Sequence, residues 1–136
     1  MNLAMRAQAI SERRSTQRTR MQPVRTLWVL LVGSPSAALE RRIQALQTAG
    51  FSVTHAESVC HAEMYSEAQY FDAVIYDPSL SEVEQVSLAR IMRVRWPWMR
   101  LVRCSHAPIH ITRDALFDAS EASESNLAES LRAMLA

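Results

Sequence analysis

Short apolar runs recur along the chain, separated by turn residues and by more polar segments. Runs of this length that contain β-branched and aromatic residues are typical of strands. The run at 73–76 is apolar throughout and is followed closely by Pro78, as expected of a strand buried on both faces of a parallel sheet. The pattern predicts five strands, at 26–32, 51–56, 73–76, 99–104 and 115–117.

Segments with apolar residues at helical spacing lie between these runs. They predict four helices. The first begins at Ser34 or Ser36 and ends at Gly50, and the second spans 58–70. The third runs from Ser81 to Pro97, and the fourth spans 124–136. In the first helix, the face toward the sheet is expected to hold Leu39, Ile43 and Leu46. The face toward water is expected to hold Arg41, Arg42, Gln44 and Gln47.

The two later helices have their own signals. Ser81 and Glu84 have the spacing of a capping box at the start of the third helix. The apolar side of that helix is expected to hold Val83, Val86, Ile91 and Val94, and that of the closing helix Leu127, Leu131, Met134 and Leu135.

Strands and helices alternate, which specifies the α/β class. Helical crossovers between successive strands require a parallel sheet with helices on both faces. We therefore predict a doubly wound (βα)5 fold with a five-stranded sheet in a three-layer α/β/α arrangement. The segment between His106 and Asp114 fits either a turn of helix or a loop.

Charge is distributed unevenly along the 136 residues. Residues 1–25 hold six arginines against the single acid Glu12, and the chain contains no lysine. We expect residues 1–25 to form a basic, flexible arm and residues 26–136 to form one domain. No stretch has the roughly 18 apolar residues of a membrane span. The two cysteines and the lack of a signal peptide favour a cytoplasmic protein.

Asp77 is the first candidate for chemistry, because it directly follows the 73–76 strand. In parallel α/β sheets, ligands and reactive groups gather at the carboxyl ends of the strands. A carboxylate at this position is either a reactive group or a polar cap on the strand.

The segment Asp72-Ala73-Val74-Ile75-Tyr76-Asp77 resembles the third strand of the receiver domain of bacterial response regulators, which have a flavodoxin-like fold. Gly50-Phe51 before the second strand and Ser105 after the fourth support the resemblance, which covers roughly residues 25–136. It implies that Asp77 is the phosphoacceptor in a two-component phosphorelay. It also implies that Ser105 and Phe117 are the switch residues.

The chain departs from the receiver pattern at two places. Gly33 and Ser34 stand where the family has the acidic pair that holds Mg²⁺, and Ser120 stands where the family has a lysine. Phosphoryl transfer depends on cations to stabilise negative charge, and one carboxylate holds Mg²⁺ poorly. These losses favour a degenerate receiver, with no catalytic residues and with Mg²⁺ relevant only if Asp77 is phosphorylatable.

Other residue groups give weaker signals. Cys104, His106 and His110, or Cys60 and His61, lack the paired spacing of a zinc site, so we predict no metal centre. Trp96-Pro97-Trp98 lies among several arginines. This group is either a binding surface or one packed tryptophan with solvated arginines. The N-terminal arm could bind nucleic acid through phosphates, but its lack of aromatic residues argues against that.

The sequence therefore predicts a stand-alone bacterial signalling domain that is not an enzyme and that acts by protein–protein contact. Its expected partner is a histidine kinase, a downstream effector or a second copy of itself. The resemblance places the docking surface on the first helix, the region of the fourth and fifth strands, and the closing helix. The alternatives are a phosphorylatable receiver that uses Asp77 and a nucleic-acid-associated module that uses the arginine-rich arm.

Overall fold

The computed structural model describes residues 25–104, 117–121 and 124–136. Residues 1–24 of the predicted arm and residues 105–116, which include Ser105, lie outside the described residues. Among the described residues, no helix has the length and apolarity needed to cross a bilayer.

Five parallel strands form one sheet with the order β3-β2-β4-β5-β6. The strands are β2 (Leu27–Val32), β3 (Phe51–Ala56), β4 (Ala73–Tyr76), β5 (Arg100–Cys104) and β6 (Ala119–Glu121). The apolar run at 73–76 is therefore the central strand, and it is buried throughout, as the pattern predicted. The α/β class and the parallel sheet are confirmed.

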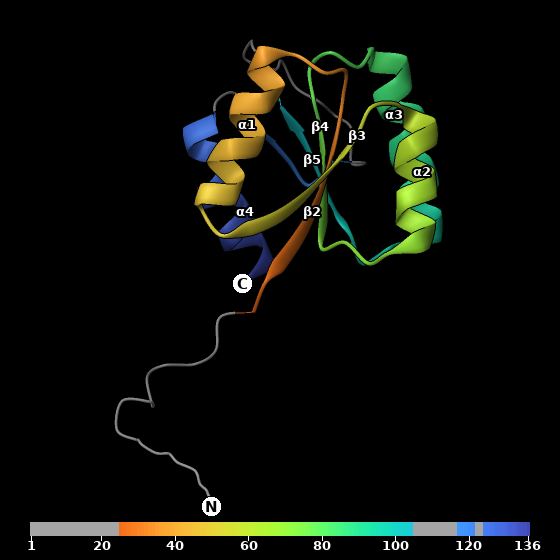
Figure 1. Ribbon diagram of the computed structural model, residues 1–136. Helices are drawn as coiled ribbons and strands as arrows, with labels where there is room; N and C mark the ends of the chain where they lie inside the picture. The colour runs from red at the N-terminus through yellow and green to blue at the C-terminus, as the bar shows by residue number, and fades with distance from the viewer. Residues whose placement is uncertain (1–24, 105–116, 122–123) are drawn as a thin grey trace, which may run out of the picture.

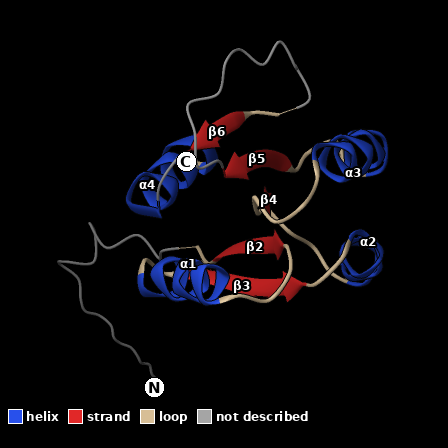
Figure 2. Ribbon diagram, turned by 90° about the horizontal axis from the view of Figure 1, so that it is seen from above, coloured by secondary structure: helices blue, strands red, loops and turns tan. Residues whose placement is uncertain are grey.

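Four helices cover the two faces of the sheet. They are α1 (Ala37–Thr48), α2 (Val59–Ala68), α3 (Glu82–Arg95) and α4 (Glu124–Leu135). Seen from above, α1 and α4 lie on one side of the sheet and α2 and α3 on the other (Figure 2). The chain winds from one face to the other and back, so the sheet is the middle of three layers (Figure 1).

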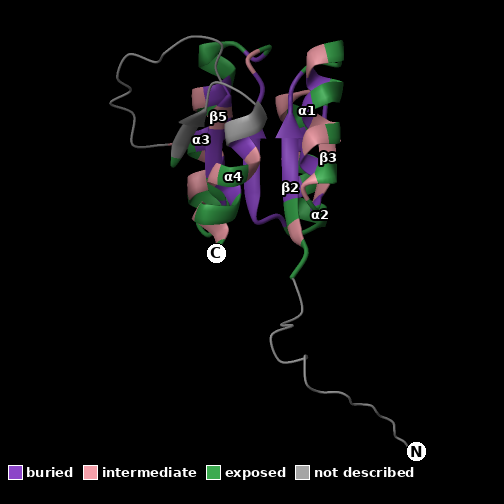
Figure 3. Cartoon of the chain, turned by 90° about the vertical axis from the view of Figure 1, so that its left-hand side faces the viewer, coloured by how far each residue is buried: buried purple, intermediate pink, exposed green. Residues whose placement is uncertain are grey.

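The core has two halves because successive residues of a strand point to opposite faces of the sheet. Leu30 and Val74 pack toward α2 and α3, while Leu31 and Ile75 pack toward α1 and α4. All four of these side chains have no exposed surface. The continuous buried region along the central strands is visible in Figure 3.

The predicted helix signals at Ser36, Gly50 and Ser81 are confirmed. The Ser36 hydroxyl accepts a hydrogen bond from the amide of Leu39 at 3.0 Å. Gly50, just after the C-cap of α1, has a φ of 101°, a left-handed conformation that favours glycine. Ser81 and Glu84 form the reciprocal capping box at the start of α3.

The predicted apolar side of α3 is wrong, because Val83 and Val94 are exposed. The buried face of this helix instead holds Gln85, Leu88, Ala89 and Met92. Gln85 is accommodated because its amide donates to the carbonyl oxygen of Leu80 at 3.0 Å. A polar residue with satisfied hydrogen bonds therefore concealed the true periodicity.

The fifth strand of the sheet lies at Ala119–Glu121. Of the strand predicted at 115–117, residues 115 and 116 lie outside the described residues, and Phe117 is not part of a strand. Asp118 fixes this register, because its amide donates to the carbonyl oxygen of Leu101 at 2.7 Å. Its carboxylate oxygen Oδ2 also accepts from the amide of Leu101 at 2.8 Å. Phe117 precedes the strand and packs against the core.

Candidate functional site

Asp77 lies at the carboxyl end of the central strand β4 and is almost fully buried. Its amide donates to the carbonyl oxygen of Val32 at 2.9 Å, and its carbonyl oxygen accepts from the amide of Leu80 at 3.1 Å. These bonds fix the backbone on both sides of the carboxylate. The backbone of Asp77 is therefore held beside the carboxyl end of β2.

Arg42 of α1 is the ion-pair partner of Asp77. Its Nη1 atom donates to Oδ1 of Asp77 at 2.5 Å, and only 8% of the Arg42 side chain and 6% of the Asp77 side chain are exposed. The prediction that Arg42 faces water is wrong. Arg42 lies on the same helical face as Leu39 and Leu46, three and four residues away. Its side chain can be buried with theirs because the Asp77 carboxylate neutralises its charge.

The second carboxylate oxygen of Asp77 is also occupied. Oδ2 accepts a hydrogen bond from the amide of Ser79 at 3.0 Å. The hydroxyl of Ser79 in turn accepts from the amide of Ser34 at 3.0 Å. The loop after β4 and the loop after β2 are therefore tied together directly beside Asp77.

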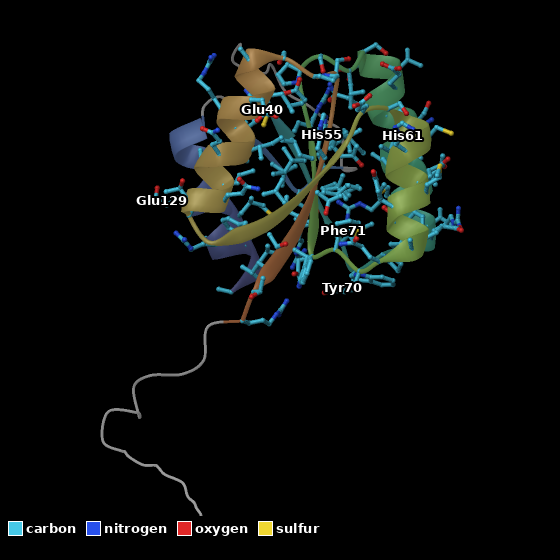
Figure 4. The ribbon with its side chains drawn as sticks, in the orientation of Figure 1. Glu40, His55, His61, Tyr70, Phe71 and Glu129 are labelled. Atoms are coloured by element: carbon cyan, nitrogen blue, oxygen red, sulfur yellow. The ribbon has the colours of Figure 1, made fainter. Side chains whose placement is uncertain are left out.

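Gly33 closes the space next to the carboxylate. A Cβ atom at position 33 would lie 2.4 Å from Cβ of Asp77 and 2.9 Å from the hydroxyl oxygen of Ser79. The Gly33 backbone is held in place because its amide donates to the carbonyl oxygen of Ala56 at 3.0 Å, and its carbonyl oxygen accepts from Nε2 of His55 at 2.8 Å. His55 and Glu40 lie toward this end of the molecule in Figure 4.

The side chains around Asp77 do not fit the Mg²⁺ ion that the receiver resemblance implies. Mg²⁺ requires near-octahedral oxygen coordination, whereas Gly33 and Ser34 offer no carboxylate and both Asp77 oxygens already accept hydrogen bonds. Within 25–104, 117–121 and 124–136, no group of three or more His, Cys, Asp or Glu residues could hold a metal ion.

The remaining candidates lie along the β5–β6 side of the site. Ser120 is the middle residue of β6, and its backbone pairs with Arg103. The ring of Phe117 meets Tyr76 edge-on with centroids 5.4 Å apart, and the guanidinium carbon of Arg103 lies 4.5 Å from its centre. Burial raises the pKa of Tyr76 well above its ordinary value. Ser105, the other switch candidate, lies outside the described residues.

The arginines around Trp96-Pro97-Trp98 bond within the molecule. Arg93 donates to Asp118 at 2.9 Å, Arg95 pairs with Glu67, and Arg103 bonds Gln85 and Glu82. Trp96 packs against the core beneath Arg95. Trp98 is about half exposed and stacks on Tyr70, with ring centroids 6.2 Å apart. One tryptophan is therefore packed, as in the second of the two alternatives, but the arginines are paired and not simply solvated.

A second buried carboxylate, Asp72, lies at the opposite end of β4. It accepts hydrogen bonds from the amide of Trp28 at 2.8 Å, from the hydroxyl of Tyr70 at 2.8 Å and from Nη2 of Arg25 at 2.5 Å. Burial alone would raise the pKa of Asp72, but these hydrogen bonds outweigh it and lower the pKa below the ordinary value. The sequence had marked Asp72 only as the start of the receiver-like segment, without a role.

The comparisons with known proteins agree with this fold. No family model matches the chain. It is 35% identical over 89 residues to the alginate biosynthesis transcriptional regulatory protein AlgB of Pseudomonas putida, and equally to AlgB of Pseudomonas aeruginosa. The matches include 65% of this chain but 20% of each relative, so the chain spans about a fifth of the length of these relatives.

Solved structures of receiver domains superpose on most of the chain. A CheY-like receiver domain from Methanospirillum hungatei has a TM-score of 0.70 and 19% identity over 82% of this chain and 94% of its own. The response regulator TrrA from Thermotoga maritima, solved with Mg²⁺ and BeF, has a TM-score of 0.71 and 18% identity over 81% of this chain and all of its own. The chain therefore has the fold of CheY-like response regulator receiver domains.

Proposed function

We propose that this chain is a degenerate receiver-like signalling domain that acts by protein–protein contact without Mg²⁺-dependent phosphorylation of Asp77. One observation carries the proposal. Both carboxylate oxygens of Asp77 accept hydrogen bonds from the protein itself, one from Arg42 and one from the amide of Ser79. The carboxylate that would have to attack a phosphodonor is thus held by intramolecular partners.

The chemistry of phosphoryl transfer supports the same conclusion. The transferred group carries negative charge on three oxygens, which metal ions and cationic side chains normally stabilise in the transition state. Here the donors for a metal are missing at Gly33 and Ser34, and the chain has no lysine. Arg42 is the one cation that contacts Asp77 in the described part of the chain, and it already neutralises the carboxylate before any transfer.

The receiver fold implies signalling partners, such as kinases or downstream effectors. We propose that the docking surface includes the exposed residues of α1 and α4, which lie side by side on one face of the sheet (Figure 2). Exposed residues on this surface include Arg41, Gln44 and Glu129. Polar groups of this kind give specificity to a contact more than raw affinity. Partner binding at this surface would use the fold and not the carboxylate.

A working phosphoacceptor is the second candidate. It is favoured by the position of Asp77 at the carboxyl end of the central strand and by the likeness to TrrA, which was solved with Mg²⁺ and BeF. In this reading Arg42 would have to release Asp77 before transfer and could then contact the phosphoryl oxygens.

Intact-protein mass spectrometry after incubation with acetyl phosphate and Mg²⁺ separates the two candidates. TrrA serves as the positive control and Asp77→Asn as the negative control, with circular dichroism to verify that each sample is folded. We expect no phosphoryl adduct on the wild-type chain. An adduct that is present in the wild type and absent from Asp77→Asn would reject the proposal in favour of the phosphorelay role.

A further inference from the structure

We propose that Arg42 is a permanent internal cation that takes the place of the divalent ion expected beside the carboxylate of a receiver. This inference deepens the proposed function and rests on it, because it assigns the loss of metal dependence to one residue. Arg42 then acts as a positioning residue: it neutralises Asp77 and joins α1 to the end of β4.

The geometry around Arg42 supports this role. A buried carboxylate is costly unless an opposite charge or hydrogen-bond donors compensate it. The guanidinium contributes both, since it carries a full charge and donates from Nη1 to Oδ1 of Asp77 at 2.5 Å. It lies on the same side of the sheet as Leu39 and Leu46, so the helix that delivers it is itself anchored in the core.

The backbone around Asp77 leaves little room for a metal ion, so the Arg42 guanidinium is the cation that compensates the Asp77 charge. Gly33 lies so close to Asp77 that even a Cβ atom would overlap it, and the amide of Ser79 occupies the other carboxylate oxygen. A metal ion would have to displace these contacts, and it would gain only one carboxylate, that of Asp77, as a ligand. The folded state of this chain is therefore expected to be indifferent to Mg²⁺.

The pair also has a mechanical consequence. Because Arg42 is in the middle of α1 and Asp77 directly follows β4, their bond fixes the helix relative to the carboxyl end of the sheet. Truncating Arg42 alone would leave the Asp77 charge buried without its cation, and removing one partner of a buried pair is strongly destabilising. Removing both charges should cost much less.

A double-mutant cycle in urea unfolding tests the inference on the full chain. The variants are Arg42→Met, Asp77→Asn and the two combined, with Arg41→Met as the matched control on the exposed face of the same helix. Arg42→Met should increase the unfolding equilibrium constant on the order of 100-fold or more in the wild-type background. In the Asp77→Asn background, Arg42→Met should increase the unfolding equilibrium constant by less than about 10-fold. Arg41→Met should change it by less than about 3-fold in either background.

The same measurement with MgCl₂ and with NaCl at matched ionic strength completes the test. The wild-type urea midpoint should be the same in both salts. Equal costs of Arg42→Met in the two backgrounds, or a specific stabilisation of the wild type by Mg²⁺, would overturn the role of Arg42. A phosphoryl adduct on a wild type that shows strong coupling would reject the proposed function and leave the role of Arg42 intact, so the two failures are distinguishable.

Discussion

The two ends of β4 carry the same chemistry in different surroundings. Asp72 precedes the strand and Asp77 follows it, each is 4% exposed, and each pairs with one arginine at 2.5 Å. The arginine side chains differ, because Arg25 at the amino end is 61% exposed and Arg42 at the carboxyl end is 8% exposed. The bond length alone therefore does not determine what each pair contributes.

The other partners of the two carboxylates explain the contrast. Asp72 accepts from an amide and a hydroxyl besides its arginine, so it remains hydrogen-bonded if Arg25 leaves. Asp77 has one amide partner, and it depends on Arg42 for its neutralising charge. The amino end of β4 thus has a carboxylate with three hydrogen-bond donors. The carboxyl end has a buried ion pair at the position that the receiver resemblance assigns to the phosphoacceptor.

Gly33→Ala should produce the largest effect among the variants that sharpen this contrast. The new Cβ would lie 2.4 Å from Cβ of Asp77, so either β2 or β4 must shift. Overpacking costs about 1–3 kcal/mol of unfolding free energy, and we expect the upper end of this range because Cβ of Asp77 cannot move away independently of its backbone. Urea denaturation measures it, and Gly50→Ala is the control, because its cost comes from a φ of 101° and not from the Asp77 contact. A Gly33→Ala variant as stable as the wild type would show that the carboxyl end is not closely packed.

Asp72→Asn should produce the next largest effect and a change in pH dependence. Loss of the charge-assisted hydrogen bonds costs about 2 kcal/mol at neutral pH. The folded-state pKa of Asp72 lies below its ordinary 3.8, so the stability it contributes is present above about pH 4 and is lost as pH falls through the folded-state pKa. The difference in unfolding free energy between the wild type and Asp72→Asn, measured by urea denaturation, should therefore become smaller as the pH falls below about 4. A difference that stays constant down to the acid unfolding transition would contradict the hydrogen-bond assignment.

Arg25→Met should have the smallest effect, since the guanidinium is mostly exposed and Asp72 keeps two other donors. Its urea midpoint should lie close to that of the wild type. The remaining difference should shrink further as NaCl is added, because exposed charge pairs are screened by salt. If Arg25→Met proved as costly as Arg42→Met, burial would not be what separates the two ends of β4.

Much of the fold was predictable from local patterns. Three features depend only on residues close together in the sequence, so the sequence alone predicts them. They are the four-residue apolar run of β4, the capping box of α3 and the glycine that follows α1. The predictions that failed concern polar side chains that are buried because partners far along the chain satisfy them. Arg42 is buried because of a carboxylate 35 residues away, and Gln85 is buried because it finds Leu80 and Arg103.

The site was only partly predictable for the same reason. The sequence pointed to Asp77 and to the absence of acids at Gly33 and Ser34, but the predicted helix faces placed no cation beside Asp77. One signal was present: Arg42 has helical spacing to both Leu39 and Leu46, which places it on the inward face. The strand at Ala119–Glu121 had no such signal, because a three-residue edge strand is held by pairing and not by apolar letters.

The contact between Gly33 and Asp77 also bears on how such a domain can change over time. The receiver resemblance predicts an acid at position 33, and any side chain there would meet Asp77 and Ser79. An acid at position 33 would therefore need a second substitution that relieves this collision. Gly33 thus limits which substitutions this part of the chain can accept one at a time.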